Sequence, residues 1–306
     1  MLTLADALVE QDDRPAYRPF SVTVSRVEEL SPSFRRVTFT GDDMEWFATH
    51  CRDQRIKILF PVDGQLSDLG AEGDWYSHWR ALPNEQRNPM RTYTARAVRP
   101  LERELDVDFV WHGDGGPAAF WIAKASVGDA VTIVGPDARS LDSHVGMDWH
   151  PGNARELLLA GDETAAPAIC GILESLPVGV RAHALITVPS GADVLELVAS
   201  ADVTVTWLAR DDNALSLDLA VRGWAAQNRG AYSPALSTSA QELEDIDVDS
   251  ELLWDSPGDA TGSFYAWLAG ESAMIKGLRR LLVSELGIDR SRVAFMGYWR
   301  QGRAES

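Results

Sequence analysis

The sequence contains very few cysteines and no long apolar run. Only Cys51 and Cys170 occur among 306 residues, and they do not form a C-x-x-C pair. This scarcity argues against a disulfide framework, a structural zinc site and an iron–sulfur cluster. The longest apolar runs, such as residues 157–160, have the length of a strand, whereas a bilayer-spanning helix needs roughly 20 apolar residues. We therefore expect no metal site built by the protein and no membrane segment.

Basic residues are also scarce. The chain has 28 Lys and Arg against 46 Asp and Glu, which gives a net charge of −18 at pH 7. A field of this sign repels nucleic acids and anionic membranes. Residues 1–13 lack the basic patch and the apolar segment of a signal peptide. We expect a cytoplasmic protein that binds neither nucleic acid nor membrane, and an anionic substrate would require a local basic patch.

The first half of the chain has a strand-like pattern. Short segments with alternating apolar and polar residues are separated by turn residues, which is typical of an antiparallel barrel or sandwich. One helix, from about residue 117 to 125, interrupts them. The strands that this pattern predicts are residues 20–24, 34–39, 55–60, 105–110 and 130–134.

The pattern changes near residue 154, where apolar runs begin to alternate with helical stretches. This alternation predicts a parallel sheet covered on both faces. The expected strands are 157–160, 182–188, 203–208, 264–269 and 292–298, with helices up to residue 175, from residue 192 and over 272–286. We place the boundary in the polar segment 137–153, which gives domains 16–150 and 151–306. Residues 226–262 are acidic and rich in Ser, Gly and Pro, and we interpret them as a surface insertion.

Two segments of the first domain could hold a flavin nucleotide. In Arg91-Thr92-Tyr93-Thr94, an aromatic ring can cover the apolar isoalloxazine, a hydroxyl can bond to its edge, and the Arg can pair with a phosphate. In residues 112–118, a glycine-rich turn places Pro117 at the first position of a helix. The free N–H groups of such a helix start suit a pyrophosphate.

Two segments of the second domain lie where an expected strand ends, and each contains a glycine at that point. Residues 159–165 pass from a strand into a helix, although they do not form a G-x-G-x-x-G fingerprint. In residues 267–271, Gly270 would permit the close approach of a flat ring. The carboxyl end of a parallel strand is where a dinucleotide is expected.

These four segments, in this order, resemble the siderophore-interacting proteins, or ferric-siderophore reductases, over residues 20–302. Further matching pieces are residues 108–113, Trp121 and residues 298–302, while Ala119-Phe120 departs from the usual Ser-Arg. The resemblance implies an antiparallel Greek-key FAD-binding barrel followed by a parallel-sheet NAD(P)-binding-like α/β domain. It implies FAD contacts from Arg91, Thr92, Tyr93, Thr94, Asp108, Val110, His112, Gly115, Gly116, Pro117 and Ala118. It also implies a nicotinamide site bordered by Asp162, Thr164, Ala165, Ala269, Gly270, Glu271 and Trp299.

The implied activity is electron transfer from NADH or NADPH through FAD to siderophore-bound Fe(III), and no side chain is expected to act as a catalyst. Fe(II) binds anionic oxygen ligands more weakly and leaves. Lys57, Arg139 and Arg300 are the candidate cations for an anionic chelate. Residues 188–191 contain no basic clamp for a 2′-phosphate, which favours NADH. We expect a monomer.

Three other functions remain compatible with the sequence. The protein could take its electrons from a ferredoxin, and reduction independent of nicotinamide would then be observed. It could be a siderophore carrier without enzymatic activity, and the purified protein would then be colourless. It could also be a general flavin reductase, which would turn over free flavin rapidly.

Overall fold

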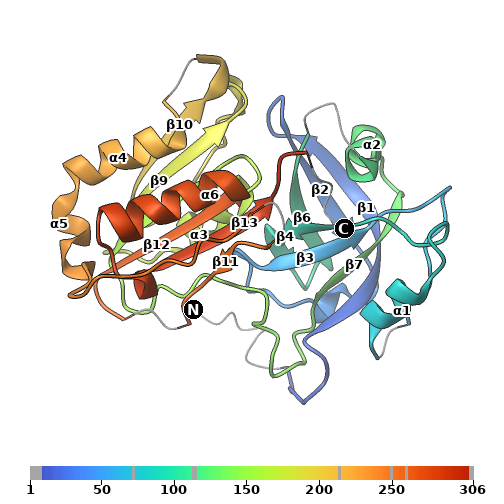
Figure 1. The fold of residues 1–306 in the computed structure, drawn as a ribbon. Coiled ribbons are helices and arrows are strands. Elements are labelled where there is room, and N and C mark those ends of the chain that lie inside the picture. Colours follow the sequence, from blue (N-terminus) through green and yellow to red (C-terminus); the bar gives the residue numbers. More distant parts are fainter. Residues whose placement is uncertain are drawn as a thin grey trace. The chain divides into compact units, whose positions relative to one another are not determined.

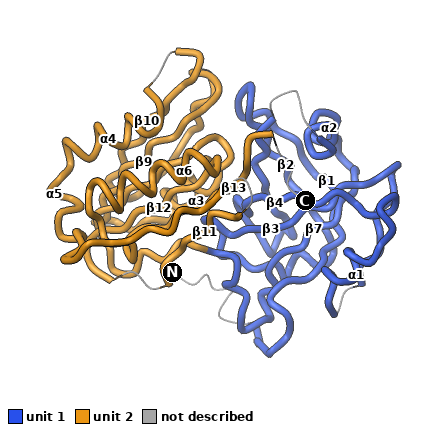
Figure 2. Tube along the Cα trace, in the orientation of Figure 1, with its two compact units in different colours: residues 1–147, 306 blue, residues 148–305 orange. Residues whose placement is uncertain are grey.

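Alternating strands in the first half of the chain and apolar runs in the second half form two separate sheets in this protein. The computed structural model describes residues 9–70, 73–111, 116–212, 215–248, 251–258 and 261–302. The chain divides into two compact units, residues 1–147 with residue 306, and residues 148–305 (Figure 2). Each unit contains one of the sheets, and the antiparallel and parallel sheets that the sequence predicts are both confirmed.

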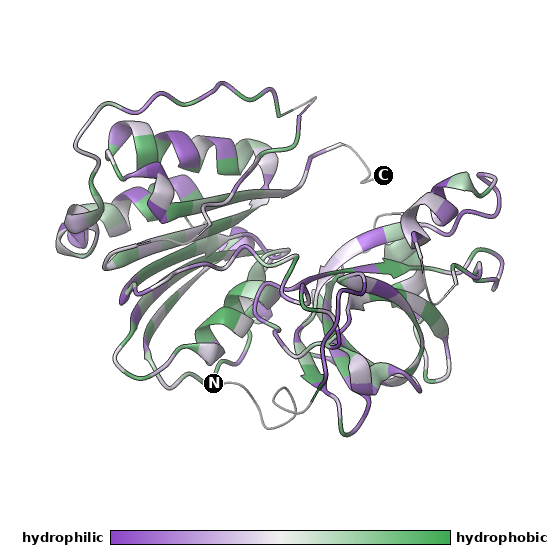
Figure 3. Ribbon diagram, turned by 90° about the horizontal axis from the view of Figure 1, so that it is seen from below, coloured by the Kyte–Doolittle hydropathy of each residue, from purple (hydrophilic) through white to green (hydrophobic). Residues whose placement is uncertain are grey.

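The sheet of the first unit has seven strands in the order β4-β3-β7-β1-β2-β6-β5, and every neighbouring pair is antiparallel. The sheet curls around an apolar interior (Figure 3). Its strands are β1 (Tyr17–Glu29), β2 (Phe34–Thr40), β3 (Arg55–Leu59), β4 (Met90–Thr94), β5 (Ala97–Arg99), β6 (Glu104–Val110) and β7 (Ala130–Pro136).

Two helices accompany this sheet. Helix α2 (Pro117–Lys124) is the predicted one. Helix α1 (Trp75–Ala81) was not predicted from the sequence; Asp74 caps it by accepting a hydrogen bond from Ser77 N. Trp79 of α1 packs on the outer face of the sheet, against Leu59 and Val134. Helix α1 therefore covers apolar residues on the outside of the barrel.

The sheet of the second unit has the strand order β10-β9-β8-β12-β13-β11. The pairs from β10 to β13 are parallel, and β11 joins the edge in the antiparallel direction. The strands are β8 (Glu156–Gly161), β9 (Arg181–Val188), β10 (Asp202–Ala209), β11 (Trp254–Asp255), β12 (Phe264–Glu271) and β13 (Val293–Trp299). The central strands β8 and β12 are almost completely buried, because helices cover both faces.

The helices of this unit are α3 (Ala166–Ser175), α4 (Leu217–Gln227), α5 (Arg229–Tyr232) and α6 (Ser272–Arg279). Helix α3 lies on one face of the sheet, and α4 and α6 lie on the other (Figures 1 and 3). Helix α6 continues as a π-helix over Arg280–Glu285. The predicted helix over 272–286 is thus present with a change of winding.

Two local expectations were wrong. The helix predicted from Ala192 is a single 3-10 turn, Gly191–Asp193, because Ser190 and Asp193 cap each other's backbone and close it. Helices α4 and α5 were missed. Helix α4 ends at the beginning of the segment 226–262 that we had interpreted as a surface insertion, and α5 lies within that segment. Their sequences contain Gly223 and Gly230, which obscure the helical period, while Val221 and Trp224 supply the buried face of α4.

Among the described residues, no helix has both the length and the apolarity that crossing a bilayer requires. Neither Cys51 nor Cys170 forms a disulfide. The same part of the chain contains no group of three His, Cys, Asp or Glu side chains arranged to hold a metal ion.

Candidate functional site

In the first unit, Arg91 lies beside the start of helix α2. Its Nη1 donates a 2.8 Å hydrogen bond to the carbonyl oxygen of Met90. A Cβ atom built on Gly116 would lie 3.8 Å from Nη2 of the same guanidinium. Gly116 caps α2 without any side-chain hydrogen bond, and Pro117 follows at the first helical position. A guanidinium and a helix N-terminus at the same place are groups that attract an anion, and an anion site here stays a prediction.

Aromatic packing fixes the position of α2. The Trp121 ring of this helix lies 5.3 Å from the Phe60 ring and 6.0 Å from the Phe109 ring. Ile122 is almost completely buried in the same cluster. Because two side chains of α2 are embedded in the barrel core, the helix start is held next to Arg91.

Tyr93 belongs to the rim of the same aromatic cluster. Its ring centroid is 4.5 Å from that of Phe109 and 6.4 Å from that of Phe60. The ring is only partly buried, so part of it remains accessible as a surface for a flat ligand. Next to it, Thr94 is buried at the end of β4. The flavin contacts proposed for Tyr93, Thr94 and Ala118 stay predictions.

Asp108 has strong partners within the protein. Its carboxylate accepts hydrogen bonds of 2.6 and 2.8 Å from Arg36, and Arg96 Nε lies 3.4 Å away. Only 1% of the side chain is exposed, so this ion pair is a structural element of the barrel. A contact from Asp108 or from Val110 to a cofactor stays a prediction. The predicted FAD contacts of His112 and Gly115 lie outside the described residues.

In the second unit, Asp162 joins the carboxyl ends of three strands. Its carboxylate accepts hydrogen bonds from Thr164 (2.9 Å from N and 2.5 Å from Oγ1), from Glu271 N (2.8 Å) and from Trp299 Nε1 (2.8 Å). These residues follow or end β8, β12 and β13, whose parallel register brings their carboxyl ends together. Four of the predicted site residues, Asp162, Thr164, Glu271 and Trp299, therefore meet in one network.

The Asp162 carboxyl has little contact with water, since the residue is 4% exposed. This burial raises the pKa of Asp162, and the hydrogen bonds from Thr164 and Trp299 act in the opposite direction. Desolvation has the larger effect, so Asp162 binds its proton more tightly than an exposed aspartate. Four hydrogen-bond donors converge on the same carboxyl group.

The glycines at this edge are required by close packing within the protein. A Cβ on Gly161 would lie 2.5 Å from the carbonyl oxygen of Ala269. Gly270 has φ +149°, and a Cβ there would lie 2.6 Å from Asp162 Oδ2. Packing against Asp162 is thus one reason for the glycine at position 270. The approach of a flat ring to Gly270 stays a prediction.

Two of the predicted residues, Ala165 and Glu271, also form helix starts at this edge. Ala165 caps helix α3 and is completely buried. Glu271 caps α6, because its side chain accepts a 2.9 Å hydrogen bond from Met274 N. The carboxylate of Glu271 is thus held at the end of β12.

Carboxylates also lie where β9 ends. Gly191 N donates a 3.1 Å hydrogen bond to Asp211, and a Cβ on Gly191 would lie 3.6 Å from Asp212 Oδ2. Both aspartates follow strand β10, which pairs with β9 in parallel. Sequence reasoning missed them, because it searched this edge for basic residues and considered only residues 188–191. A third missed feature is the ion pair between Arg210 and Glu163, with distances of 2.7 and 2.8 Å.

The three candidate substrate cations have partners inside the protein. Lys57 Nζ donates a 2.6 Å hydrogen bond to Thr92 Oγ1. Arg139 binds Asp137 through two nitrogens, with distances of 2.9 and 2.6 Å, and Arg300 donates to the carbonyl oxygen of Glu251. Their predicted role towards a ferric chelate stays a prediction. Arg139 has a clear structural role in addition.

The donor set of the first unit fits a flavin adenine dinucleotide. The Arg91 guanidinium and the start of α2 can bind a pyrophosphate, and the partly exposed Tyr93 ring can cover the flavin. The second unit presents the carboxyl ends of a parallel sheet, where dinucleotides bind in open α/β folds.

A curled antiparallel sheet followed by a parallel α/β sheet is the architecture of ferredoxin-reductase-like flavoproteins. The structure of the ferredoxin reductase of carbazole 1,9a-dioxygenase aligns with a TM-score of 0.55 at 14% identity, covering 93% of this chain and 71% of that one. At this low identity the likeness concerns the fold alone.

The chain belongs to the siderophore-interacting protein family. Residues 23–140 match the siderophore-interacting FAD-binding domain, and residues 154–302 match the siderophore-interacting protein model. The structure of a siderophore utilization protein from T. fusca aligns with a TM-score of 0.68 at 26% identity, covering 95% of this chain and 96% of that one.

Curated relatives extend over nearly the whole chain. The ferric vibriobactin reductase ViuB of Vibrio cholerae is 28% identical over 92% of this chain and 89% of its own length. The NADPH-dependent ferric-chelate reductase of Escherichia coli is 27% identical over 91% of both chains. An uncharacterized protein of Mycobacterium tuberculosis is 32% identical over 94% of this chain and 91% of its own length.

Proposed function

We propose that this protein is an FAD-dependent reductase of ferric siderophores that draws its electrons from NADH or NADPH. The observation that carries the proposal is the anion site formed by Arg91 and the start of α2, in a domain that matches the FAD-binding model of the family. The relatives named as ferric vibriobactin reductase and ferric-chelate reductase support the choice of substrate.

In this proposal the protein binds and orients its ligands. FAD would link the nicotinamide, which donates two electrons at once, to Fe(III), which accepts one electron at a time. Arg91 and the N–H groups of α2 hold the pyrophosphate. Tyr93 covers the flavin. Asp162 fixes Glu271 and Trp299 at the edge where the nicotinamide is proposed to bind, through the hydrogen bonds described above.

The carboxylates beside Gly191 favour NADH over NADPH. In dinucleotide-binding sheets, the residues after the second strand lie near the adenosine ribose, where a carboxylate accepts hydrogen bonds from the hydroxyls. Asp211 and Asp212 lie beside this position, and their charges would repel a 2′-phosphate. The relative from Escherichia coli is named as NADPH-dependent, so its preference can be compared directly with the NADH preference that we propose for this protein.

Anaerobic mixing tests the proposed function. The purified protein should be yellow and should release FAD on denaturation. NADH should bleach the flavin absorbance, and a ferric siderophore should then restore it with release of Fe(II). Bleaching by reduced ferredoxin and not by either nicotinamide would identify a ferredoxin-dependent enzyme. A colourless protein that cannot be reconstituted with FAD, yet binds the siderophore, would overturn the proposal in favour of a carrier.

We further propose that the protein acts in the cytoplasm as a monomer. Neither cysteine forms a disulfide, and reduced thiols and NADH are both found in that compartment. Sedimentation at increasing concentration tests the oligomeric state, and a mass of twice 33.6 kDa would contradict it.

A further inference from the structure

A pocket of about 340 Å³ lies among the helices that cover one face of the second sheet, where α4 and α6 run (Figure 1). The volume corresponds to roughly eleven water molecules at about 30 Å³ each, so it suits a ligand of about ten non-hydrogen atoms. The lining comes from α4, α5 and the π-helix with its cap, and it includes Arg222, Ala225, Arg229, Tyr232, Leu281 and Leu286.

The pocket is remote from the edge where we propose that the nicotinamide binds. The Tyr232 ring lies 6.4 Å from the ring of Phe264, which is the first residue of β12. Glu271, whose backbone N–H is bound by Asp162, is the last residue of the same strand. The eight residues of β12 span roughly 23 Å, so a ligand in this pocket would occupy a separate site.

The π-helix shapes the apolar floor of the pocket. Leu286 N donates a 2.9 Å hydrogen bond to the carbonyl oxygen of Leu281, which is the spacing of a π-helix. Side chains five positions apart point about 140° away from each other on an α-helix, and the wider π winding turns them towards one face. Both leucines line the same pocket as a result. Single π turns of this kind are frequent at functional sites.

Tyr232 brings a polar group to this apolar floor. The residue is 5% exposed and packs on Trp224, with the ring centroids 6.0 Å apart. No residue that the structure describes forms a hydrogen bond with the Tyr232 hydroxyl. Buried tyrosines usually have a hydrogen-bond partner, so a ligand in the pocket would supply the missing acceptor.

The two arginines of the pocket differ in their partners. Arg222 is held by two carboxylates, at 2.9 Å from Asp218 and 2.6 Å from Glu285. Arg229 forms no ion pair with any Asp or Glu side chain in the described part of the chain. It lies three residues before Tyr232 on α5, a spacing that places two side chains on one side of a helical turn. A guanidinium and a phenol hydroxyl in this arrangement suit a carboxylate.

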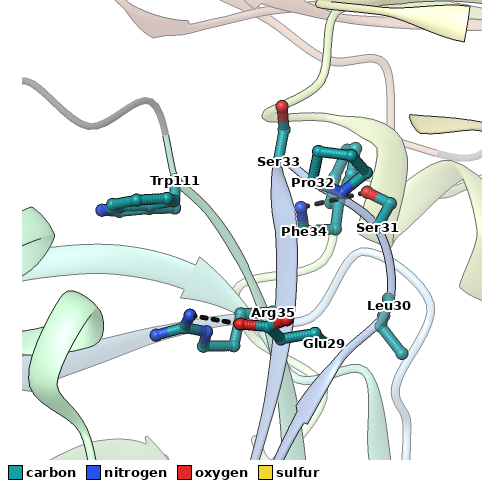
Figure 4. Close-up of a pocket in the computed structure, with 8 residues that line it drawn as sticks. All are labelled: Glu29, Leu30, Ser31, Pro32, Ser33, Phe34, Arg35 and Trp111. Atoms are coloured by element: carbon teal, nitrogen blue, oxygen red, sulfur yellow. Dashed lines mark hydrogen bonds and ion pairs between the residues drawn. The ribbon is translucent and has the colours of Figure 1, made fainter. Parts of the chain in front are cut away.

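The larger pocket of the first unit differs in this respect. Its volume is about 480 Å³, and residues 29–35 and Trp111 line it (Figure 4). The cation of that pocket, Arg35, donates hydrogen bonds of 2.8 Å to Glu29 and to the carbonyl oxygen of Ile122. Its donors are thus used within the protein, whereas those of Arg229 are not used by the described residues.

We propose that the pocket formed by α4, α5 and the π-helix binds a small monocarboxylate with an apolar body. The carboxylate pairs with Arg229 and accepts a hydrogen bond from the Tyr232 hydroxyl. The apolar body packs on Ala225, Leu281 and Leu286. Neither FAD nor the nicotinamide takes part in this site, so the inference is independent of the proposed function, and its failure would leave that function intact.

Equilibrium dialysis of the full-length protein as purified tests the inference. The probes are octanoate and benzoate, with octanamide as the uncharged analogue of octanoate. Octanoate should bind saturably with a Kd of about 1 mM or lower, as expected for a ligand of about ten non-hydrogen atoms, and octanamide should bind more weakly. In Arg229→Gln the Kd for octanoate should rise about fivefold, whereas the Kd for octanamide should not change.

Tyr232→Phe separates binding from folding. It keeps the ring and its packing on Phe264, so the free energy of unfolding should stay close to the wild-type value. The Kd for octanoate should nevertheless rise about threefold or more, because the carboxylate loses a hydrogen bond.

Arg280→Gln is the matched control. Arg280 belongs to the same π-helix, its side chain is 79% exposed, and it does not line the pocket, so its replacement should leave the Kd unchanged. Saturable binding of either acid that is weakened by Arg229→Gln and Tyr232→Phe supports the inference. A wild-type protein that binds neither acid would overturn it. Equal effects of Arg229→Gln and Arg280→Gln, or an amide that binds as tightly as the acid, would overturn it as well.

Discussion

The indole Nε1 of Trp299 donates a 2.8 Å hydrogen bond to the carboxylate of Asp162, although 137 residues separate them. Trp299 ends β13, Asp162 follows β8, and β12 lies between these two strands. Asp162 also accepts a hydrogen bond from Glu271 N, which belongs to β12. One buried carboxylate thus connects three adjacent strands at the edge where we propose that the nicotinamide binds.

Replacement of Asp162 should affect both stability and nicotinamide binding. Asp162→Ala leaves the donors of Thr164, Glu271 and Trp299 without their acceptor, and each unsatisfied buried donor costs about 1–3 kcal/mol. We expect the free energy of unfolding to fall by about 3 kcal/mol or more. The KM for NADH should rise, because Glu271 and Trp299 lose their common anchor. Denaturant titration and steady-state kinetics measure the two effects.

Asp202→Ala is the matched control in the same unit. Asp202 is exposed, and its pairing with Arg181 has a distance of 3.5 Å, so its loss should change stability by less than about 1 kcal/mol. If Asp162→Ala were no more destabilising than this control, the network would not be important for stability.

Much of this edge could be predicted from the sequence, because local patterns carry the information. The apolar runs at 157–160 and 264–269, each followed by a polar or glycine residue, predict strand ends. The partners of Asp162 could not be predicted, because they depend on the order of β8, β12 and β13 in the sheet. The packing of Gly270 could not be predicted for the same reason, since the atom nearest to a Cβ at this position belongs to Asp162, which is 108 positions away.

The first unit gives a similar lesson. Pro117 was correctly predicted to begin a helix, whereas the strand that contains residues 91–94 was not among the expected strands. Their spatial relationship, with Arg91 next to Gly116, depends on how the sheet curls and how Trp121 docks. Asp108 could be recognised as a polar residue in a strand, but its pairing with Arg36 depends on the register of β2 and β6.

The second prediction concerns the choice of nicotinamide. Asp211→Asn combined with Asp212→Asn removes two negative charges beside Gly191. Each charge near a partly screened phosphate contributes on the order of 1 kcal/mol of repulsion, so kcat/KM for NADPH should rise at least about tenfold. The value for NADH should stay the same or fall. Stopped-flow reduction with both nucleotides provides the measurement.

Asp218→Asn, on the exposed surface of α4, is the control for general charge effects. It should leave the preference unchanged. A wild-type enzyme that already prefers NADPH would show that these carboxylates do not face the adenosine ribose.

The third prediction concerns Tyr93. Tyr93→Ala should weaken FAD binding, because the flavin loses a stacking surface worth about 1 kcal/mol beyond its buried area. Tyr93→Phe keeps the ring and its packing on Phe109, so it should bind FAD almost as tightly as the wild type. Flavin fluorescence titration measures both variants. An alanine variant with unchanged affinity and an unchanged spectrum would show that Tyr93 is only a strand residue.

The fourth prediction is a pH dependence that arises from Asp137. Its side chain is 1% exposed and accepts hydrogen bonds from Arg18 and Arg139. Burial alone would raise the pKa of Asp137, but the bonds from Arg139 outweigh it and hold the pKa below its usual value of 3.8. The stabilisation is present above the unfolded-state pKa and is lost as the pH falls through the lower, folded-state value.

Denaturant titration between pH 7 and pH 2 tests this dependence. Asp137→Asn should be less stable than the wild type at pH 7 by about 3 kcal/mol, because Arg139 loses its bidentate carboxylate partner and Arg18 keeps only its pairing with Asp43. The difference should shrink as the pH falls below about 4. A difference that stays constant down to pH 2 would show that the charge of Asp137 does not contribute.

The last prediction tests the capture of an anionic ferric chelate by Lys57, Arg139 and Arg300. Each cation near a partly screened anion contributes roughly 1 kcal/mol, so removing all three should lower kcat/KM for an anionic ferric siderophore on the order of a hundredfold. Added salt should produce a similar loss in the wild type. Reduction of a small neutral acceptor should be unaffected.

The contacts of the three cations determine which substitutions should be combined in the triple variant. Arg139 is the bidentate partner of the buried Asp137, so Arg139→Ala alone would destabilise the barrel. The triple variant should therefore carry Asp137→Asn as well, and Asp137→Asn alone is its control. Lys57→Met retains most of the side-chain volume beside Thr92, and Arg300→Ala removes an exposed contact to the carbonyl oxygen of Glu251. Losses of equal size on neutral and anionic acceptors would mean that these residues support the fold or the flavin, and the cations that attract the chelate would then be others.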